Sequence, residues 1–143
     1  ANLERLQGRY DNAEAGYLTA LKLNPKFVPG YVNLSDLYRE WLRESEAEQT
    51  LRNGLKRLPE QAYLHHALGL SLVRQQRLEE AILELKIAAE LPDATARFAA
   101  VYVIALDSTG ENDAAREYLQ SALRRFNNHP ELLEISQSLQ QRE

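Results

Sequence analysis

Residues 26–59 read KFVPGYVNLSDLYREWLRESEAEQTLRNGLKRLP, and this stretch is the unit from which the chain is built. Pro25 and Pro59 are 34 residues apart, and alanines recur at the same spacing in two series. The first series is Ala13, Ala47, Ala81 and Ala115. The second is Ala20, Gly54, Ala88 and Ala122, in which Gly54 replaces one alanine. A fixed period of about 34 residues predicts a stacked array of small units, each in contact with its neighbours.

Each unit is predicted to contain two helices. Apolar residues recur at steps of three and four, as in Tyr31, Leu34 and Leu37, which is the pattern of an amphipathic helix. No sustained alternation and no Asn-Gly hairpin indicates a strand. We therefore expect an all-α chain. Its helices are predicted at 11–24, 28–41, 44–57, 61–75, 78–90, 95–108, 111–126 and 130–141, after a short helical piece at 1–6.

Glycine and proline mark the predicted helix ends. Gly8 and Gly110 fall between the first and second helix of a unit, where a glycine can adopt the left-handed conformation that closes a helix. Pro25 and Pro59 fall between units, where proline stops one helix and can begin the next. The recurrent alanines are predicted to be core residues at which two helices of one unit approach closely. Leu51, Leu85 and Leu119 would fill the space one turn further on.

The same residues carry a family resemblance. Tyr31, Leu34, Ser35 and Tyr38, followed by Ala47, Leu51, Gly54 and Pro59, resemble a complete tetratricopeptide repeat, and the other units match in the same register. Trp41, Leu42 and Gln76 depart from the small turn residues of that pattern. The resemblance implies a right-handed superhelical solenoid of antiparallel helix pairs. It would form one domain over 1–143, with units at 1–25 (partial), 26–59, 60–93 and 94–127 and a capping helix at 128–143.

A second resemblance concerns context. The stretches 31–38, 64–70 and 97–104 look like repeat arrays attached to bacterial multihaem cytochrome proteins. This resemblance implies an accessory module of a larger periplasmic electron-transfer protein, whereas a cytoplasmic location is the default without it. The chain contains no methionine, which favours a fragment or a processed product.

Composition excludes several functions. The net charge of −4 disfavours nucleic-acid binding, which needs clustered cations. No cysteine is present, so thiolate catalysis and most structural zinc sites are excluded. No apolar stretch approaches the ~20 residues that span a bilayer, so membrane insertion is not expected.

The sequence shows no arrangement typical of an active site. Ser71 follows Gly69 but lacks the second glycine of a nucleophile elbow, and neither His65 nor His66 has a His, Asp or Glu four residues further on. His65 is predicted to be a packed core residue and His66 to lie toward the concave surface. Glu44, Glu46, Glu48, Glu79 and Glu80 are expected on exposed faces, with Glu48 pairing with Arg52. We therefore predict no enzyme activity, no metal and no cofactor.

In arrays of this family the first helices of the units line a concave groove. The resemblance would place Val32, Asn33, Asp36, Arg39, Tyr63, His66, Ala67, Leu70, Val73, Arg97, Ala100, Val101, Ile104 and Asp107 there. The predicted partner-binding residues are Asn33, Asp36, Tyr63, His66, Leu70, Arg97, Val101 and Ile104. Leu70 and Ile104 have the alternative role of packing against neighbouring helices.

Three functions remain open at this point. The first is a non-catalytic scaffold that binds an extended peptide or helix of another protein in the groove. The second is an assembly module that self-associates through its incomplete N-terminal face. The third is the accessory cytochrome module. A family variant that clamps the C-terminal carboxylate of chaperones is not expected here, because Tyr63 and Ala67 stand where it has cations.

Overall fold

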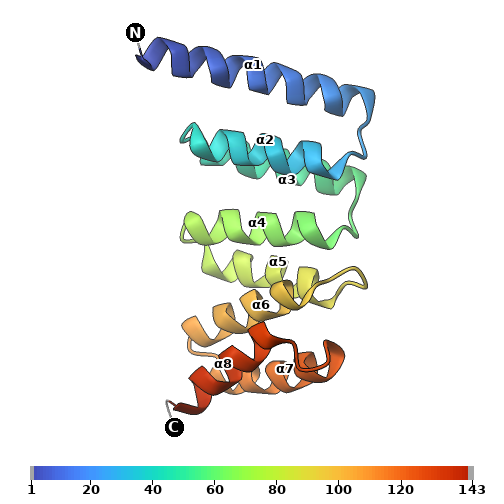
Figure 1. Cartoon of the computed structure of the whole chain (residues 1–143), viewed down its shortest axis with the longest axis vertical. Helices are drawn as coiled ribbons and strands as arrows, with labels where there is room; N and C mark the ends of the chain where they lie inside the picture. The colour runs from blue at the N-terminus through green and yellow to red at the C-terminus, as the bar shows by residue number, and fades with distance from the viewer. Residues whose placement is uncertain (1, 142–143) are drawn as a thin grey trace.

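The computed structural model describes residues 2–141, and that range folds into eight α-helices without a strand. The helices are α1 (Asn2–Leu23), α2 (Val28–Glu40), α3 (Glu44–Arg57), α4 (Ala62–Arg74), α5 (Leu78–Glu90), α6 (Ala96–Ser108), α7 (Asn112–Arg125) and α8 (Pro130–Gln141). They stack in chain order into an elongated solenoid, with the two termini at opposite ends (Figure 1). Within the described range, no helix is both long enough and apolar enough to cross a bilayer. The outermost positions of the predicted domain, 1 and 142–143, lie outside the described residues.

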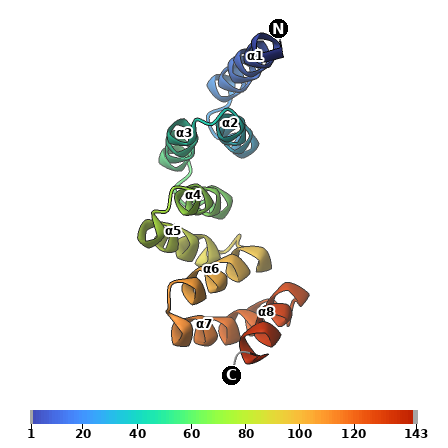
Figure 2. The ribbon, with the colours of Figure 1, turned by 90° about the vertical axis from the view of Figure 1, so that its left-hand side faces the viewer.

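The helices pair as the sequence predicts. α2 packs on α3, α4 on α5 and α6 on α7, and each pair contacts the next through the first helix of the following unit. Viewed from the side, α2 and α4 lie on one side of the stack and α3 and α5 on the other (Figure 2). α8 packs on both α6 and α7 and closes the C-terminal end. From α2 onward, the predicted helix ends agree with the observed ends to within one residue.

The predicted break at Gly8 is wrong. α1 runs without interruption from Asn2 to Leu23, so the short first piece and the following helix form one element. A glycine closes a helix where the chain turns to pack a second helix against the first. Apart from its chain neighbours and the backbone of its own helix, no atom lies within 4 Å of the place that a Cβ of Gly8 would occupy. Nothing therefore folds back at this point, and the helix continues at the modest cost of an interior glycine.

The turns inside the later units share one geometry. Leu42, Gln76 and Gly110 follow one another at the repeat period, and all three have a positive φ, of 59°, 62° and 87°. In each turn the following amide donates to the carbonyl five residues earlier, as in Arg43 N to Tyr38 O at 2.7 Å. This bond is that of a Schellman motif, in which the left-handed residue is usually glycine. The prediction for Gly110 is confirmed, and two non-glycine residues adopt the same conformation.

Small residues form the contacts between paired helices. Ala47, Ala81 and Ala115 are completely buried, which confirms their predicted role in the core. Gly69 of α4 faces α5 so closely that a Cβ would lie 2.6 Å from Cδ2 of Leu85. A Cβ there would force the fully buried Leu85 side chain to move, so glycine at this position favours the close spacing of α4 and α5.

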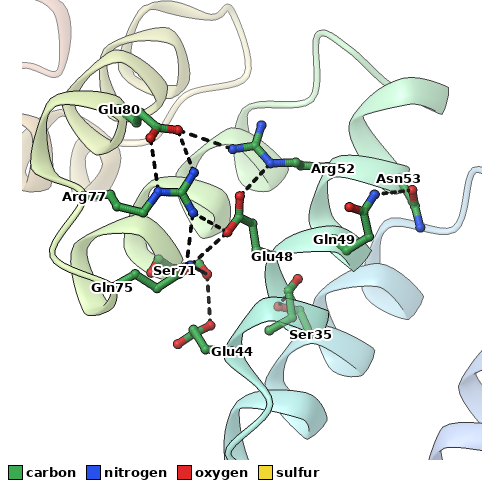
Figure 3. A network of polar contacts seen from close by, with 11 residues as sticks. Ser35, Glu44, Glu48, Gln49, Arg52, Asn53, Ser71, Gln75, Arg77 and Glu80 are labelled. Carbon is green, nitrogen blue, oxygen red and sulfur yellow. Dashed lines mark hydrogen bonds and ion pairs between the residues drawn. The ribbon is translucent and has the colours of Figure 1, made fainter.

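A polar network joins the second and third units (Figure 3). Glu48 of α3 accepts hydrogen bonds from Arg52 Nε at 2.8 Å, Gln75 Nε2 at 3.1 Å and Arg77 Nη1 at 2.7 Å. The predicted pair of Glu48 and Arg52 is confirmed. The expectation that Glu44 and Glu48 lie on exposed faces is wrong, because both are half-buried. Burial alone would raise the pKa of Glu48, and the three hydrogen bonds outweigh it and hold that pKa below its usual value.

The left-handed turn residues give a test of the fold. A side chain in the left-handed region costs roughly 1 kcal/mol relative to glycine. Leu42 is 92% exposed, so its side chain contributes little packing. We expect Leu42→Gly to raise the free energy of unfolding by up to about 1 kcal/mol, measured by urea denaturation. The matched control is Gly110→Ala, which should lower it by a similar amount. A stabilising Gly110→Ala or a destabilising Leu42→Gly would contradict this account of the turns.

Candidate binding groove

One groove of about 390 Å³ crosses the first helices of three successive units. α2, α4 and α6 form its walls, and the segment before α6 completes it. Its lining residues are Val32, Ser35, Asp36, Arg39, Tyr63, His66, Ala67, Leu70, Arg74, Thr95, Arg97 and Phe98. A concave site with an apolar floor and a few polar groups at its edge is typical of sites that bind ligands or peptides.

The structure brings five of the eight predicted binding residues into this groove. They are Asp36, Tyr63, His66, Leu70 and Arg97. Asn33 is exposed on α2 but does not line the groove. Val101 is half-buried and packs against the core shared by α6 and α7.

Ile104 lies in a separate cleft of about 310 Å³ between α6 and α8. Glu134, Ile135, Ser138 and Leu139 of α8 form its opposite wall. Because α8 packs across α6, it divides the surface that a regular array would present as one groove. Of the eight predicted residues, five therefore line the groove, Ile104 lines this second cleft, and Asn33 and Val101 line neither.

An aromatic cluster forms one end of the groove. The His66 ring stacks on Phe98, with centroids 4.3 Å apart and planes 22° from parallel. Tyr63 meets the same Phe98 edge to face at 5.9 Å, and its side chain is about half exposed. Tyr63 thus presents a rigid aromatic surface to the groove. Rings held in this way are preferred anchors in protein interfaces.

The charges at the groove edge differ in how they are held. Arg74 pairs with Glu44 at 2.6 Å, and Arg97 pairs with Glu131 at 2.6 Å. Asp36 and Arg39 form no hydrogen bond or ion pair through their side chains with another described residue. The Arg39 guanidinium is therefore available to donate hydrogen bonds to a ligand in the groove, and the Asp36 carboxylate is available to accept them.

His65 and His66 are adjacent but have opposite environments. His65 Nδ1 lies 2.7 Å from a carboxylate oxygen of Glu84, and Nε2 lies 2.7 Å from the carbonyl oxygen of Pro59. The carbonyl oxygen and an ionised Glu84 carboxylate can only accept, so this arrangement favours the imidazolium form, in which both ring nitrogens donate. Burial lowers the pKa of His65, but these hydrogen bonds outweigh it and the pKa lies above its usual value. The predicted core role of His65 is confirmed.

His66 is neutral at pH 7. Burial, together with the positive charge of Arg97, lowers the pKa of His66 to about 4. Its Nδ1 is buried and has no hydrogen-bond partner among the described residues. A buried polar atom without a partner is uncommon. His66 therefore contributes an apolar ring face to the groove and not a charge.

Sequence reasoning missed four of the lining residues: Ser35, Arg74, Thr95 and Phe98. Arg74 lies one turn after Leu70 on α4, so the helical period could have indicated it. Phe98 lies one repeat period after Leu64, which is fully buried, so the repeat pattern predicts a core position for Phe98. Phe98 is indeed buried, and it lines the groove where its ring stacks on His66. No group of acidic and histidine side chains that could hold a metal occurs in the described part of the chain.

Comparisons with known proteins concern the fold. TTC0263 of Thermus thermophilus, described as a thermophilic TPR protein, matches over 93% of this chain and 74% of its own, with 23% identity and a TM-score of 0.73. YrrB, described as a TPR protein with an unusual peptide-binding site, matches over 92% of this chain and 68% of its own, with 22% identity and a TM-score of 0.65. The chain has the tetratricopeptide-repeat (TPR) fold.

A third solved structure with this TPR architecture is that of MamA. It matches over 89% of this chain and 72% of its own, with 24% identity and a TM-score of 0.67. A scan against models of protein families and a search of curated proteins find no match. None of these findings supports the resemblance to arrays attached to cytochromes.

The charged state of His65 gives a prediction for pH dependence. Its pKa in the folded chain lies above the unfolded value of about 6.5. Its contribution to stability is therefore complete below about pH 6.5 and is lost as pH rises through the folded-state pKa. We expect the free energy of unfolding, measured in urea from about pH 6 to 9, to fall more steeply for the wild type than for His65→Gln. Parallel curves would contradict the assignment of an imidazolium.

Proposed function

We propose that this TPR chain is a non-catalytic scaffold that binds an extended peptide or a helix of a partner protein in the groove of α2, α4 and α6. The observation that carries the proposal is the convergence of Asp36, Tyr63, His66, Leu70 and Arg97 on one concave surface. YrrB, which has the same fold, is described as having a peptide-binding site. That description makes peptide binding in this chain a reasonable inference by analogy of fold.

The groove suits an extended main chain for a physical reason. Asp36 and Arg39 offer an acceptor and several donors one turn apart on α2, and neither side chain is hydrogen-bonded or ion-paired within the described chain. Leu70 and Ala67 of α4 add apolar surface to the same groove. A peptide could therefore satisfy its backbone groups along α2 while an apolar side chain enters against α4. We infer that Tyr63 is the main anchor.

The test compares two double variants in affinity capture from a native extract, quantified by mass spectrometry. Tyr63→Ala/Arg39→Glu changes the groove. Leu83→Ala/Lys86→Glu makes the same kinds of change on exposed positions of α5 and serves as the control. We expect a partner that the control retains and the groove variant loses, because truncating a central aromatic anchor costs about 2 kcal/mol or more. Equal retention by both variants would place the interaction outside the groove.

A second candidate, assembly through the N-terminal face, is favoured by the surface of α1. Leu3 is 82% exposed, Leu6 41% and Leu18 49%. Large apolar side chains exposed in this way often mark an interaction site. Self-association through the N-terminal part of α1 would bury Leu3 and Leu6, which are close together on the helix.

Sedimentation velocity over a wide concentration range separates the two candidates. The scaffold proposal expects a constant sedimentation coefficient. A coefficient that rises with concentration in the wild type and not in Leu3→Glu/Leu6→Glu would favour assembly, since the two charges would oppose burial of this face.

A further inference from the structure

A cleft of about 720 Å³ lies between α1 and α3, with α2 beneath it. None of its lining residues lines the groove, so it is a second and separate surface. The lining comprises Leu18, Leu21, Lys22, Pro25, Tyr31, Leu34, Tyr38, Glu46, Gln49, Thr50, Asn53, Lys56 and Arg57. Its floor is apolar and its α3 wall is polar.

The next junction along the array shows why this cleft is open. Between α3 and α5, Arg52 bonds to Glu48 on its own helix at 2.8 Å and reaches Glu80 on α5 at 3.7 Å (Figure 3). Arg52 therefore crosses the space between these two helices.

One repeat period before Glu48, Arg52 and Glu80, the chain has Glu14, Leu18 and Glu46. Both glutamates of the bridge are thus present at the α1–α3 junction, but leucine stands where the arginine would be. Leu18 cannot pair with either carboxylate. The space that Arg52 crosses in one junction stays open in the other, with an apolar side chain at its edge.

One end of the cleft is positively charged. Lys22 of α1 and Lys56 and Arg57 of α3 line it, and none of the three forms an ion pair with another described residue. The single acidic residue of the lining, Glu46, lies 3.6 Å from Arg43. The lining thus carries a positive balance in a chain whose net charge is −4.

Helix stability explains only part of this cluster. Lys22, Lys56 and Arg57 lie in the last turns of their helices, where a positive charge interacts favourably with the helix dipole and stabilises the helix. That effect acts on each helix separately, and it does not require the two ends to meet at an apolar cleft. Unpaired cations beside an apolar surface attract a ligand that has acidic and apolar groups side by side.

We propose that the α1–α3 cleft binds an amphipathic segment of a partner protein, with its apolar side chains against Leu18, Leu21 and Leu34 and its acidic residues at Lys22, Lys56 and Arg57. The proposal is independent of the groove and adds a second binding surface to the chain. It also assigns a role to Leu18, which keeps the cleft open by replacing the bridging arginine.

Leu18→Arg is the matched variant for the test. It introduces, at the α1–α3 junction, the glutamate–arginine–glutamate bridge that α3 and α5 already contain, and it should place a guanidinium group across the cleft. Leu18 is half exposed, so the substitution removes little packing. Lys56→Glu/Arg57→Glu is the second variant, because both positions are exposed and the change reverses the charge without altering the floor. If Leu18→Arg fails to fold, the charge variant serves alone.

The probe is a displayed library of random peptides of about 16 residues, long enough for a helix of about 24 Å. It is selected on the wild-type chain and counter-selected on Leu18→Arg. Enriched peptides are synthesised with a fluorescent label, and their affinities are measured by anisotropy. We expect them to be acidic and amphipathic. Their binding should weaken by roughly tenfold or more with either cleft variant and stay within about twofold with the groove variant Tyr63→Ala.

Several outcomes would overturn the proposal. One is that no peptide distinguishes the wild type from the variants. Another is that the enriched peptides lack acidic residues or bind Lys56→Glu/Arg57→Glu with unchanged affinity. Tighter binding of a single-stranded oligonucleotide than of the acidic peptides would likewise assign the basic end to nucleic acid. Peptides lost with Tyr63→Ala but kept by both cleft variants would belong to the groove.

Discussion

The close approach of paired helices at small residues is the constraint on which the rest of this structure depends. Ala47, Ala81 and Ala115 have no exposed surface, and each occupies the same place in its unit. A larger residue there would push the second helix of the unit away from the first. Because the same spacing is set again in every unit, the first helices come to lie side by side and create one face. The groove is thus a consequence of packing that takes place away from it.

The small residues determine how the helices stack, so the polar side chains at the junctions between units can differ from one junction to the next. The position of Arg52 holds Leu18 one unit earlier and Lys86 one unit later. Arg52 bridges two glutamates on neighbouring helices, and it does so in a network that also engages Gln75 and Arg77. Salt bridges at a surface contribute little stability singly. Their effect here is local: Arg52 crosses the space between α3 and α5, whereas the cleft between α1 and α3 has no such side chain across it.

The sequence was sufficient for the regular part of the fold and insufficient where a residue departs from the repeat. Helical periodicity located α2 to α8 because each has an apolar stripe that must be buried. Gly8 misled the prediction, since a glycine permits a turn without requiring one. Leu42 and Gln76 adopt the same left-handed turn as Gly110, because the Schellman hydrogen bonds offset the strain. The separation of Ile104 from the groove depends on how α8 crosses α6, which no local pattern encodes.

The groove of α2, α4 and α6 and the cleft between α1 and α3 differ in how far their charged side chains are already paired. This difference affects which kind of ligand each surface can recognise. In the groove, Arg74 and Arg97 are already neutralised by Glu44 and Glu131, so recognition there depends on Tyr63, apolar contact and the polar groups of α2. Glu44 also accepts a hydrogen bond from Ser71 at 2.9 Å, and Gln75 joins Ser71 to Glu48. The position of Arg74 at the groove edge is therefore determined by the same network that fills the α3–α5 junction. Between α1 and α3 that network is absent, and Lys22, Lys56 and Arg57 form no ion pair with another described residue, so this junction combines an open apolar cleft with charge that a partner could pair.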